Sequence, residues 1–169
     1  MLVARHNTPT LTKRQRNIAE YISGFTDGEG CFSVSFSRRK KFLIGWETKP
    51  SFSVGQNYNR AEVLYLMQNY FGCGFMRRDY KDKTLKFEVR SLHHLINTVI
   101  PHFEKYTLLS AKQKDFLAFR KICLHMTKGE HTNLEGLRKI TALAFTMNGS
   151  GKRKYSRKKI LTVASQMKI

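Results

Sequence analysis

The spacing of apolar and polar residues predicts two β-hairpins, each preceded by a helix. Residues 31–39 show the strand pattern, because Phe32, Val34 and Phe36 alternate with serines as in a strand with one buried face. The same reasoning assigns helices to residues 13–26, 59–71 and 92–99, and strands to residues 31–39, 48–56, 75–78 and 84–90. Two such hairpins are expected to merge into one antiparallel sheet, with helices on its apolar face and an open polar face.

The first predicted helix carries two different stripes. Large apolar residues recur at helical spacing and are expected to form its core face. Small residues on another side let a second backbone approach closely, so this stripe is expected to contact a second copy of the chain. The core face comprises Ile18, Tyr21, Ile22 and Phe25, and the dimer interface comprises Ala19, Ser23, Gly24 and Asp27.

Two acidic residues, Asp27 and Glu29, stand among glycines directly after this helix. If two copies of the helix pair through their small stripes, the helix ends bring these carboxylates and the nearby main-chain carbonyls together. Hard divalent cations prefer oxygen donors of both kinds. The sequence therefore predicts a divalent-metal site at the end of the helix.

The charge of the chain indicates what such a site acts on. The chain has 31 Lys and Arg against 12 Asp and Glu, which gives a formal net charge of +19, and its pI is about 10.2. A surface this basic favours a polyanionic partner. A hard metal beside phosphate gives the first functional hypothesis, which is a metal-dependent enzyme acting on nucleic acid.

Length and composition restrict the class of protein. With 169 residues and 41% hydrophobic content, the chain can fill the core of one α+β domain. It contains no apolar run long enough for a membrane span, and residues 1–7 lack the apolar stretch of a secretory signal. An intracellular location is expected, either the cytoplasm or nucleoid, or an organelle such as a mitochondrion or chloroplast. The three cysteines are far apart and are expected to be reduced and structural.

Helices are expected to continue after residue 101, up to about residue 148. Beyond them, residues 152–159 read KRKYSRKK, a basic run that follows two glycines. We expect this run to be a loosely tethered arm that seeks phosphate. The predicted organisation is one domain over residues 1–150, followed by a basic C-terminal tail over residues 151–169.

Residues 22–30 read ISGFTDGEG and resemble the signature motif of the LAGLIDADG homing endonucleases, in one visible copy. Residues 52–56, 101–106, 112–114 and 130–148 are similar to segments that follow the motif in this family. The resemblance implies the α-β-β-α-β-β-α homing-endonuclease fold. This α+β fold has an antiparallel, saddle-shaped DNA-binding sheet, here with additional C-terminal helices.

The resemblance also implies an activity. Members of the family cleave both strands of a long, pseudo-palindromic intron-insertion target across the minor groove, and single-motif members act as homodimers. Metal binding is implied for Glu29 and the Gly28 carbonyl, whereas Asp27 matches a position that caps the helix and faces the partner, outside the metal shell. The catalytic residues are expected to be Glu29, Gln56, Arg60 and Lys112. The expected cofactor is Mg²⁺ or Mn²⁺, with Ca²⁺ binding but not supporting cleavage.

The open polar face of the sheet is expected to recognise the base sequence of the DNA target. A strand of about ten residues covers ~33 Å, close to the length of ten base pairs, so two symmetry-related sheets follow a site of about 20 base pairs. Arg and Lys suit guanine, Glu accepts from cytosine, and Ser is adaptable. The expected DNA contacts are Ser35, Ser37, Arg39, Lys49, Ser51, Ser53, Arg77, Asp79, Lys86 and Glu88.

Two other functions are compatible with the same fold. An intron-encoded RNA maturase uses the basic surface to bind intron RNA, and a non-catalytic nucleic-acid-binding protein keeps the motif helix but loses its acidic residue. Glu29 together with Gln56 and Lys112 argues against the second function. Maturase activity beside cleavage stays open on the sequence alone. The expected partners are therefore double-stranded DNA, a second copy of the chain and, for a maturase, intron RNA, with no membrane.

Overall fold

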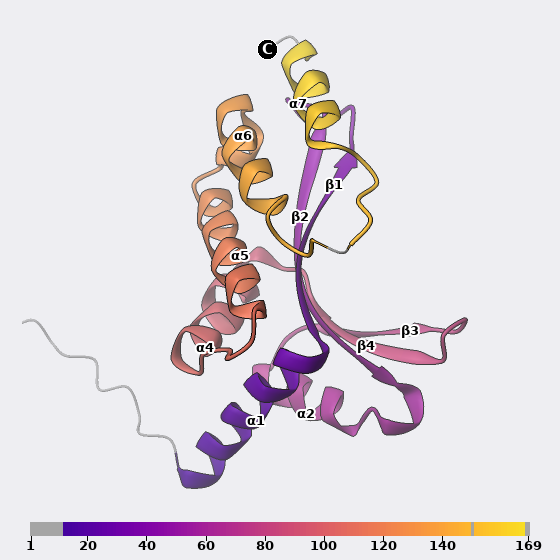
Figure 1. Cartoon of the computed structure of the whole chain (residues 1–169), viewed down its shortest axis with the longest axis vertical. Coiled ribbons are helices and arrows are strands. Elements are labelled where there is room, and N and C mark those ends of the chain that lie inside the picture. Colours follow the sequence, from indigo (N-terminus) through magenta and orange to yellow (C-terminus); the bar gives the residue numbers. More distant parts are fainter. Residues whose placement is uncertain (1–11, 150, 168–169) are drawn as a thin grey trace, which may run out of the picture.

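One four-stranded antiparallel sheet, in the order β1-β2-β4-β3, organises the fold (Figure 1). The computed structural model describes residues 12–149 and 151–167. The strands are β1 (Gly30–Arg38), β2 (Trp46–Asn57), β3 (Phe75–Asp79) and β4 (Thr84–Val89). Gly30 pairs with Val54 and Phe52 pairs with Val89, so β2 joins the two hairpins. The merged sheet and the α+β fold class predicted from the sequence are confirmed.

Helices make up much of the remaining chain. The principal ones are α1 (Lys13–Glu29), α2 (Glu62–Phe71), α4 (Ile100–Lys105), α5 (Lys112–Thr127), α6 (Leu134–Ala144) and α7 (Arg157–Gln166). Shorter turns are the 3₁₀ turns η1 (Tyr58–Arg60) and η3 (Glu130–Thr132), the short α3 (Leu92–His94) and the π-helical η2 (Leu95–Val99). In Figure 1, α4, α5 and α6 stand on one side of β1 and β2, and α1 leads directly into β1.

The helix predicted over residues 92–99 is longer than expected and continues past Pro101. α3 passes through η2 into α4, and Pro101 lies in the first turn of α4. Proline has no N–H to donate, and the hydrogen-bond register changes directly before it, since η2 is π-helical and the Ile100 N–H donates to the Leu95 carbonyl. The helical path therefore continues to Lys105.

Phenylalanines from both layers form the core between the sheet and the helices. Phe32 and Phe52 lie on neighbouring strands, and their rings stack with centroids 5.2 Å apart. Phe103 of α4 and Phe116 of α5 each approach Phe32 with ring centroids 5.3 Å apart. All four rings are buried. This packing holds α4 and α5 against one face of the sheet and leaves the serine-bearing face outside.

Helix α1 buries Ile22 and three small side chains and leaves Tyr21 outside. Its buried positions, at i, i+3, i+4 and i+7, are Ala19, Ile22, Ser23 and Thr26. Tyr21 is 53% exposed, so the predicted core face is wrong there. The expectation that Ala19 and Ser23 lie open for a partner is also wrong. The physical reason is close packing, because small side chains allow α1 to approach its own core, where Ser23 donates a hydrogen bond to the Tyr106 carbonyl after α4.

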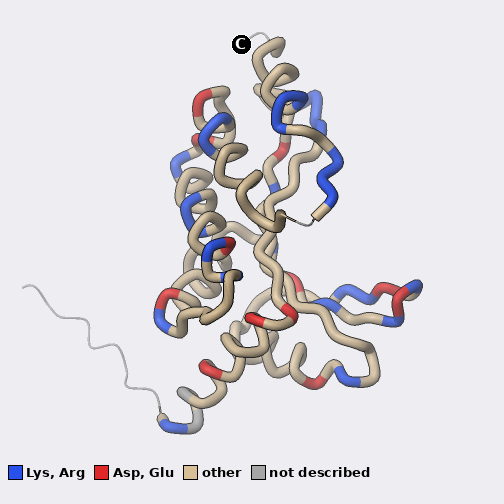
Figure 2. The backbone as a smooth tube through the Cα atoms, in the orientation of Figure 1, with Lys and Arg blue, Asp and Glu red and all other residues tan. Residues whose placement is uncertain are grey.

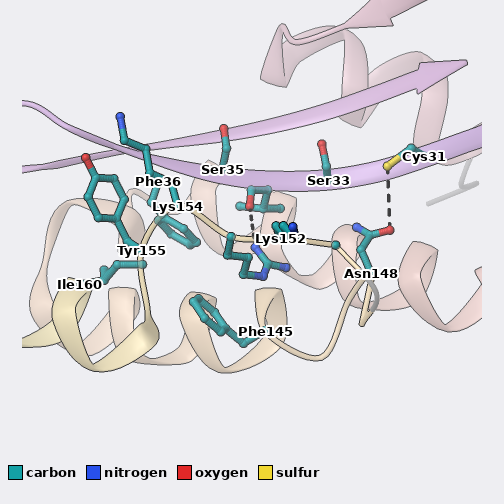
Figure 3. A pocket seen from close by; sticks show the side chains of 13 residues that line it. Cys31, Ser33, Ser35, Phe36, Phe145, Asn148, Lys152, Lys154, Tyr155 and Ile160 are labelled. Carbon is teal, nitrogen blue, oxygen red and sulfur yellow. Dashed lines mark hydrogen bonds between the residues drawn. The ribbon is translucent and has the colours of Figure 1, made fainter. Parts of the chain in front are cut away.

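The C-terminal segment lies against the edge of the sheet, which corrects the expectation of a loosely tethered arm. Arg153 donates hydrogen bonds to the carbonyl of Val34 on β1 and to those of Ala144 and Met147 near the end of α6. Two apolar residues of α7 are buried as well. Between β1 and this segment lies a pocket of about 540 Å³ (Figure 3). The basic run is held at this edge because one of its two arginines, Arg153, points inward, and a count of charges does not reveal that direction.

Candidate nucleic-acid and metal site

Glu29 is the last residue of α1 and is exposed. Gly30 ends the helix, with its N–H donating to the Thr26 carbonyl. Carbonyls after that point, including the carbonyl of Gly28, have no partner within the helix. An exposed carboxylate, unpaired carbonyls and the negative end of the helix dipole therefore coincide, and this position attracts cations.

Lys112 brings a positive charge to the same position. It begins α5, and its ammonium group donates a hydrogen bond to the carbonyl of Gly30, the residue that follows Glu29. The two residues are 82 positions apart in the sequence. The fold thus places two of the expected catalytic residues at one helix end.

Asp27 holds the loop that carries Lys112. Its carboxylate accepts hydrogen bonds from the backbone N–H of Leu109 and from the hydroxyl of Ser110, both at 2.7 Å. Partial burial acts to raise the pKa of Asp27, but these hydrogen bonds and the Lys112 charge outweigh it, so the pKa lies below its ordinary value. The carboxylate is used within its own protomer, which corrects its expected direction toward a partner helix.

Gln56 and Arg60 line a hollow beside α1. Gln56 lies two residues after Val54, which pairs with Gly30, and its side-chain oxygen accepts a hydrogen bond from the Asn57 N–H at 2.8 Å. The hollow measures about 370 Å³. Its lining residues are Tyr21, Phe25, Gln56, Arg60, Glu62, Val63 and Leu66. The hollow thus places Gln56 and Arg60 beside Tyr21 and Phe25 of α1, and its lining includes neither Glu29 nor Lys112.

A buried histidine anchors α1 to the helices behind it. Ser23 Oγ donates to the Tyr106 carbonyl at 2.7 Å and lies 3.1 Å from His102 Nε2, so Nε2 carries the proton and donates to Oγ. His102 Nδ1 lies 3.1 Å from the Tyr70 hydroxyl and accepts a hydrogen bond from it. Burial lowers the pKa of His102 to about 4. The imidazole is therefore neutral at neutral pH, with both nitrogens engaged.

Acidification is expected to destabilise the fold through His102. An exposed histidine in the unfolded chain takes up a proton near pH 6.5, whereas folded His102 does so only near pH 4. Stability is therefore lost as the pH falls from 6.5 toward 4, by about 2 kcal/mol between pH 7 and pH 5. Urea unfolding at several pH values measures this loss. His102→Gln is expected to flatten the slope, and an identical slope in both proteins contradicts the assignment.

The predicted DNA contacts all lie on the sheet face opposite α5, but they differ in exposure. Ser35, Arg39 and Arg77 are exposed, Ser37, Lys49, Asp79 and Lys86 are half-buried, and Ser51, Ser53 and Glu88 are buried. Ser51 donates a hydrogen bond to Glu88 at 2.7 Å. Since both side chains are buried and bonded to each other, the expectation that they contact bases directly is corrected. Figure 2 shows Lys and Arg on the β3–β4 hairpin and on the chain before α7, with acidic residues at the end of α1.

The solvent-facing side of α1 carries Gly24, which the sequence predicts in the dimer interface, together with Gly28, which it does not. Gly24 and Gly28 are exposed, and a Cβ added to either one meets nothing within 4 Å. Tyr21 is exposed on the same helix, and Leu109, at 92% exposure, is exposed near its end. The available signal was the i, i+4 spacing of the two glycines, which places them on one face.

The donors of one protomer fit a divalent metal only in part. Within residues 12–149 and 151–167, no three His, Cys, Asp or Glu side chains gather into a metal-binding group. The end of α1 offers the Glu29 carboxylate and the Gly28 carbonyl. Mg²⁺ and Mn²⁺ take such oxygen donors, and Mg²⁺ commonly completes its shell with substrate phosphate and water. The donor types of Glu29 and Gly28 therefore fit such a metal, although one protomer supplies a single carboxylate.

The fold and the site define an α+β protein that presents an open, basic sheet face beside oxygen donors at the end of one helix. Residues 22–123 match the family model described as LAGLIDADG endonuclease. The chain belongs to the LAGLIDADG endonuclease family, as the motif in residues 22–30 implied. None of the helices in the described parts of the chain is both long and apolar enough to cross a membrane.

Known proteins of this kind resemble the chain in sequence and structure. "Probable intron-encoded endonuclease 2" of Neurospora crassa is 36% identical over 129 residues, which cover 76% of this chain and 28% of that protein. The archaeal intron-encoded homing endonuclease I-Vdi141I, complexed with DNA, has a TM-score of 0.83 and 28% identity, over 90% of this chain and 98% of that chain.

I-SmaMI, bound to an uncleaved DNA target in the presence of calcium ions, has a TM-score of 0.75 and 25% identity. This match covers 86% of the present chain and 48% of I-SmaMI. The chain also spans only 24% to 28% of the length of three curated relatives, two from Neurospora crassa and one from Podospora anserina. Activity, substrate and partners are therefore matters of proposal.

Proposed function

We propose that the chain is a site-specific, metal-dependent DNA endonuclease that acts as a homodimer. The observation that carries this proposal is the contact of the Lys112 ammonium with the Gly30 carbonyl, which places a cation beside Glu29 at the end of a basic sheet. The similarity to I-Vdi141I, a homing endonuclease complexed with DNA, supports it. In this proposal residues 1–150 are the endonuclease domain, and the basic segment 151–169 adds positive charge beside β1.

The homodimer follows from the incompleteness of one protomer. One Glu29 supplies one carboxylate, and cleavage of two strands needs two such sites. Gly24 and Gly28 allow a second α1 to approach closely, and Tyr21 and Leu109 are apolar side chains that such contact covers. The chain covers 48% of I-SmaMI, as expected if that longer chain carries two copies of this fold.

The reaction is hydrolysis of a phosphodiester in each strand of a long, pseudo-palindromic target, across the minor groove. The cofactor is Mg²⁺ or Mn²⁺, held by Glu29 and the Gly28 carbonyl, and when bound it supplies Lewis-acid charge for the attacking water and the leaving oxygen. Calcium ions are proposed to bind without supporting cleavage. The calcium-containing complex of I-SmaMI with uncleaved DNA is consistent with this proposal.

The side chains around the end of α1 have distinct roles in this proposal. Gln56 orients the attacking water through its amide. Arg60 and Lys112 stabilise the charge that grows on the phosphate in the transition state. Asp27 positions Lys112 by holding residues 109 and 110.

A cleavage assay tests the proposed function. Plasmid DNA carrying the uninterrupted intron-insertion sequence is incubated with the protein and Mg²⁺, and one linear product is expected, with none in excess chelator. Specific binding of this DNA without nicking in Mg²⁺ or Mn²⁺ contradicts catalysis and supports a non-catalytic binding protein. Preferential binding of intron RNA over this DNA supports a maturase instead.

Replacing Lys112 with methionine is expected to lower the single-turnover cleavage rate by about 10²-fold or more, because the transition-state phosphate loses a nearby positive charge. DNA affinity is expected to change little. Lys114→Met is the matched control, since Lys114 is exposed two residues further along α5. A wild-type rate in Lys112→Met removes Lys112 from the catalytic set.

A further inference from the structure

Glu88 is a buried carboxylate in the middle of the sheet face proposed to bind DNA. It is 6% exposed. Its Oε1 accepts a hydrogen bond from the Ser51 hydroxyl at 2.7 Å, and its Oε2 accepts one from Arg90 at 2.8 Å. The Arg77 guanidinium lies 3.6 Å from the same Oε2. Both oxygens are therefore engaged by groups of the protein.

This carboxylate is held in its charged form. Partial burial acts to raise the pKa of Glu88, but the hydrogen bonds from Ser51 and Arg90 and the charges of Arg90 and Arg77 outweigh it, so the pKa is lowered. A cytosine amino group that bonded to Glu88 would have to displace one of these donors. Direct base reading by Glu88 is therefore disfavoured.

The two arginines are in the opposite situation. The side chains of Arg77 and Arg90 are 46% and 55% exposed, although each places one nitrogen near Glu88. A guanidinium has five N–H donors, so most of them stay available to a ligand. Arg90 is restrained further, because its guanidinium carbon lies 5.4 Å from the centroid of the Phe75 ring.

We propose that Glu88 is a positioning residue for target recognition, which fixes Arg77 and Arg90 so that their remaining N–H groups meet acceptor atoms on base edges. Arginine in this setting pairs best with the O6 and N7 atoms of guanine. Ser51 supports the same arrangement by holding the other oxygen of Glu88. The inference rests on the proposed function, since it takes double-stranded DNA as the ligand of this face.

A second carboxylate on the same face provides a matched control. Glu47 lies 2.9 Å from Arg39 and 3.2 Å from Lys49, and its side chain is 29% exposed, against 8% for Glu88. Solvent screens such a cluster, so it restrains its cations weakly. Glu47→Gln removes the same charge from the same face without releasing a buried anchor.

The test compares affinities over a set of DNA targets, each with one base pair substituted, in chelator so that no cleavage occurs. The proteins are wild type, Glu88→Gln, Arg77→Ala/Arg90→Ala, the triple variant with all three changes, and Glu47→Gln. Glu88→Gln is expected to reduce discrimination by roughly tenfold at a few base pairs, and Arg77→Ala/Arg90→Ala at the same ones. Glu47→Gln is expected to change all affinities alike.

The triple variant is decisive. If Glu88 acts through Arg77 and Arg90, adding Glu88→Gln to the Arg77→Ala/Arg90→Ala protein leaves its base-pair preferences unchanged. A further change at a cytosine-containing base pair instead shows that Glu88 reads DNA itself, and a wild-type pattern in Glu88→Gln shows that it positions nothing; either result overturns the inference. Ser51→Ala, a milder change, is expected to affect the same base pairs if Glu88→Gln unfolds. The affinities of the wild-type protein are measured first. If the wild type binds all targets equally, the proposed function is refuted before any variant is compared.

Discussion

Glu29→Gln is expected to abolish DNA cleavage while leaving DNA binding intact. Glutamine keeps the shape of the side chain at the end of α1 but removes the charge proposed to hold the metal ion. Loss of such electrostatic stabilisation lowers the single-turnover rate by at least about 10²- to 10³-fold. Affinity stays equal or rises slightly, since one negative charge leaves a surface that faces phosphate. Cleavage in Mg²⁺ and binding in chelator are measured on the same target.

Glu135→Gln is the control for this experiment, because Glu135 is an exposed carboxylate in the first turn of α6. It is expected to behave as wild type in both assays. Added salt is expected to weaken binding of all three proteins with the same slope, because the Lys and Arg contacts to phosphate are unchanged. Cleavage by Glu29→Gln at the wild-type rate removes Glu29 from the proposed metal site.

Gly24→Leu is expected to separate the proposed dimer and to abolish double-strand cleavage. A Cβ at Gly24 meets nothing within 4 Å in the protomer, so the folded chain accommodates the larger side chain. Leucine also favours a helix over glycine by up to about 1 kcal/mol, so thermal stability of the protomer is expected to hold or rise. Close approach of a second α1 is lost. Analytical ultracentrifugation, thermal unfolding and cleavage assays distinguish these effects.

Ala142→Leu provides the control, because Ala142 is exposed on α6, away from α1. It adds the same apolar side chain without reaching the proposed interface, and it is expected to stay dimeric and active. A monomeric wild-type protein with full activity on duplex DNA contradicts the dimer. Replacing Ser23 is a poor test, since its hydroxyl is buried and hydrogen-bonded to the Tyr106 carbonyl.

The strands were predictable because their alternation is local. Phe32 and Val34 point to the core and Ser33 and Ser35 point away, whatever the neighbouring strand is, so a period of two fixes the face. The family resemblance added the positions of Glu29 and Lys112. No local pattern connects these two residues, because Lys112 lies 82 positions after Gly30, the residue whose carbonyl it contacts.

The orientation of α1 could not be read in the same way. Two faces of the helix could be buried. Hydrophobicity favours the face with Tyr21, whereas the close approach of α1 to its own core buries the face with Ala19 and Ser23. That choice depends on His102, whose contact with Ser23 spans 79 positions in the sequence. Burial of Glu88 escaped prediction for a similar reason, because its partner Ser51 lies on another hairpin.

The way Asn148 and Arg153 contact β1 has a consequence for how the protein behaves when no DNA is bound. β1 is an outer strand, and such strands can recruit strands of other molecules and lead to aggregation. Asn148 donates to the carbonyl of Phe32 at 2.7 Å and Arg153 donates to that of Val34 at 3.2 Å, so side chains occupy acceptors that an incoming strand requires. Removing residues after 147 deletes both of these side chains and frees the Phe32 and Val34 carbonyls for the N–H groups of another strand, so the shortened protein is expected to aggregate.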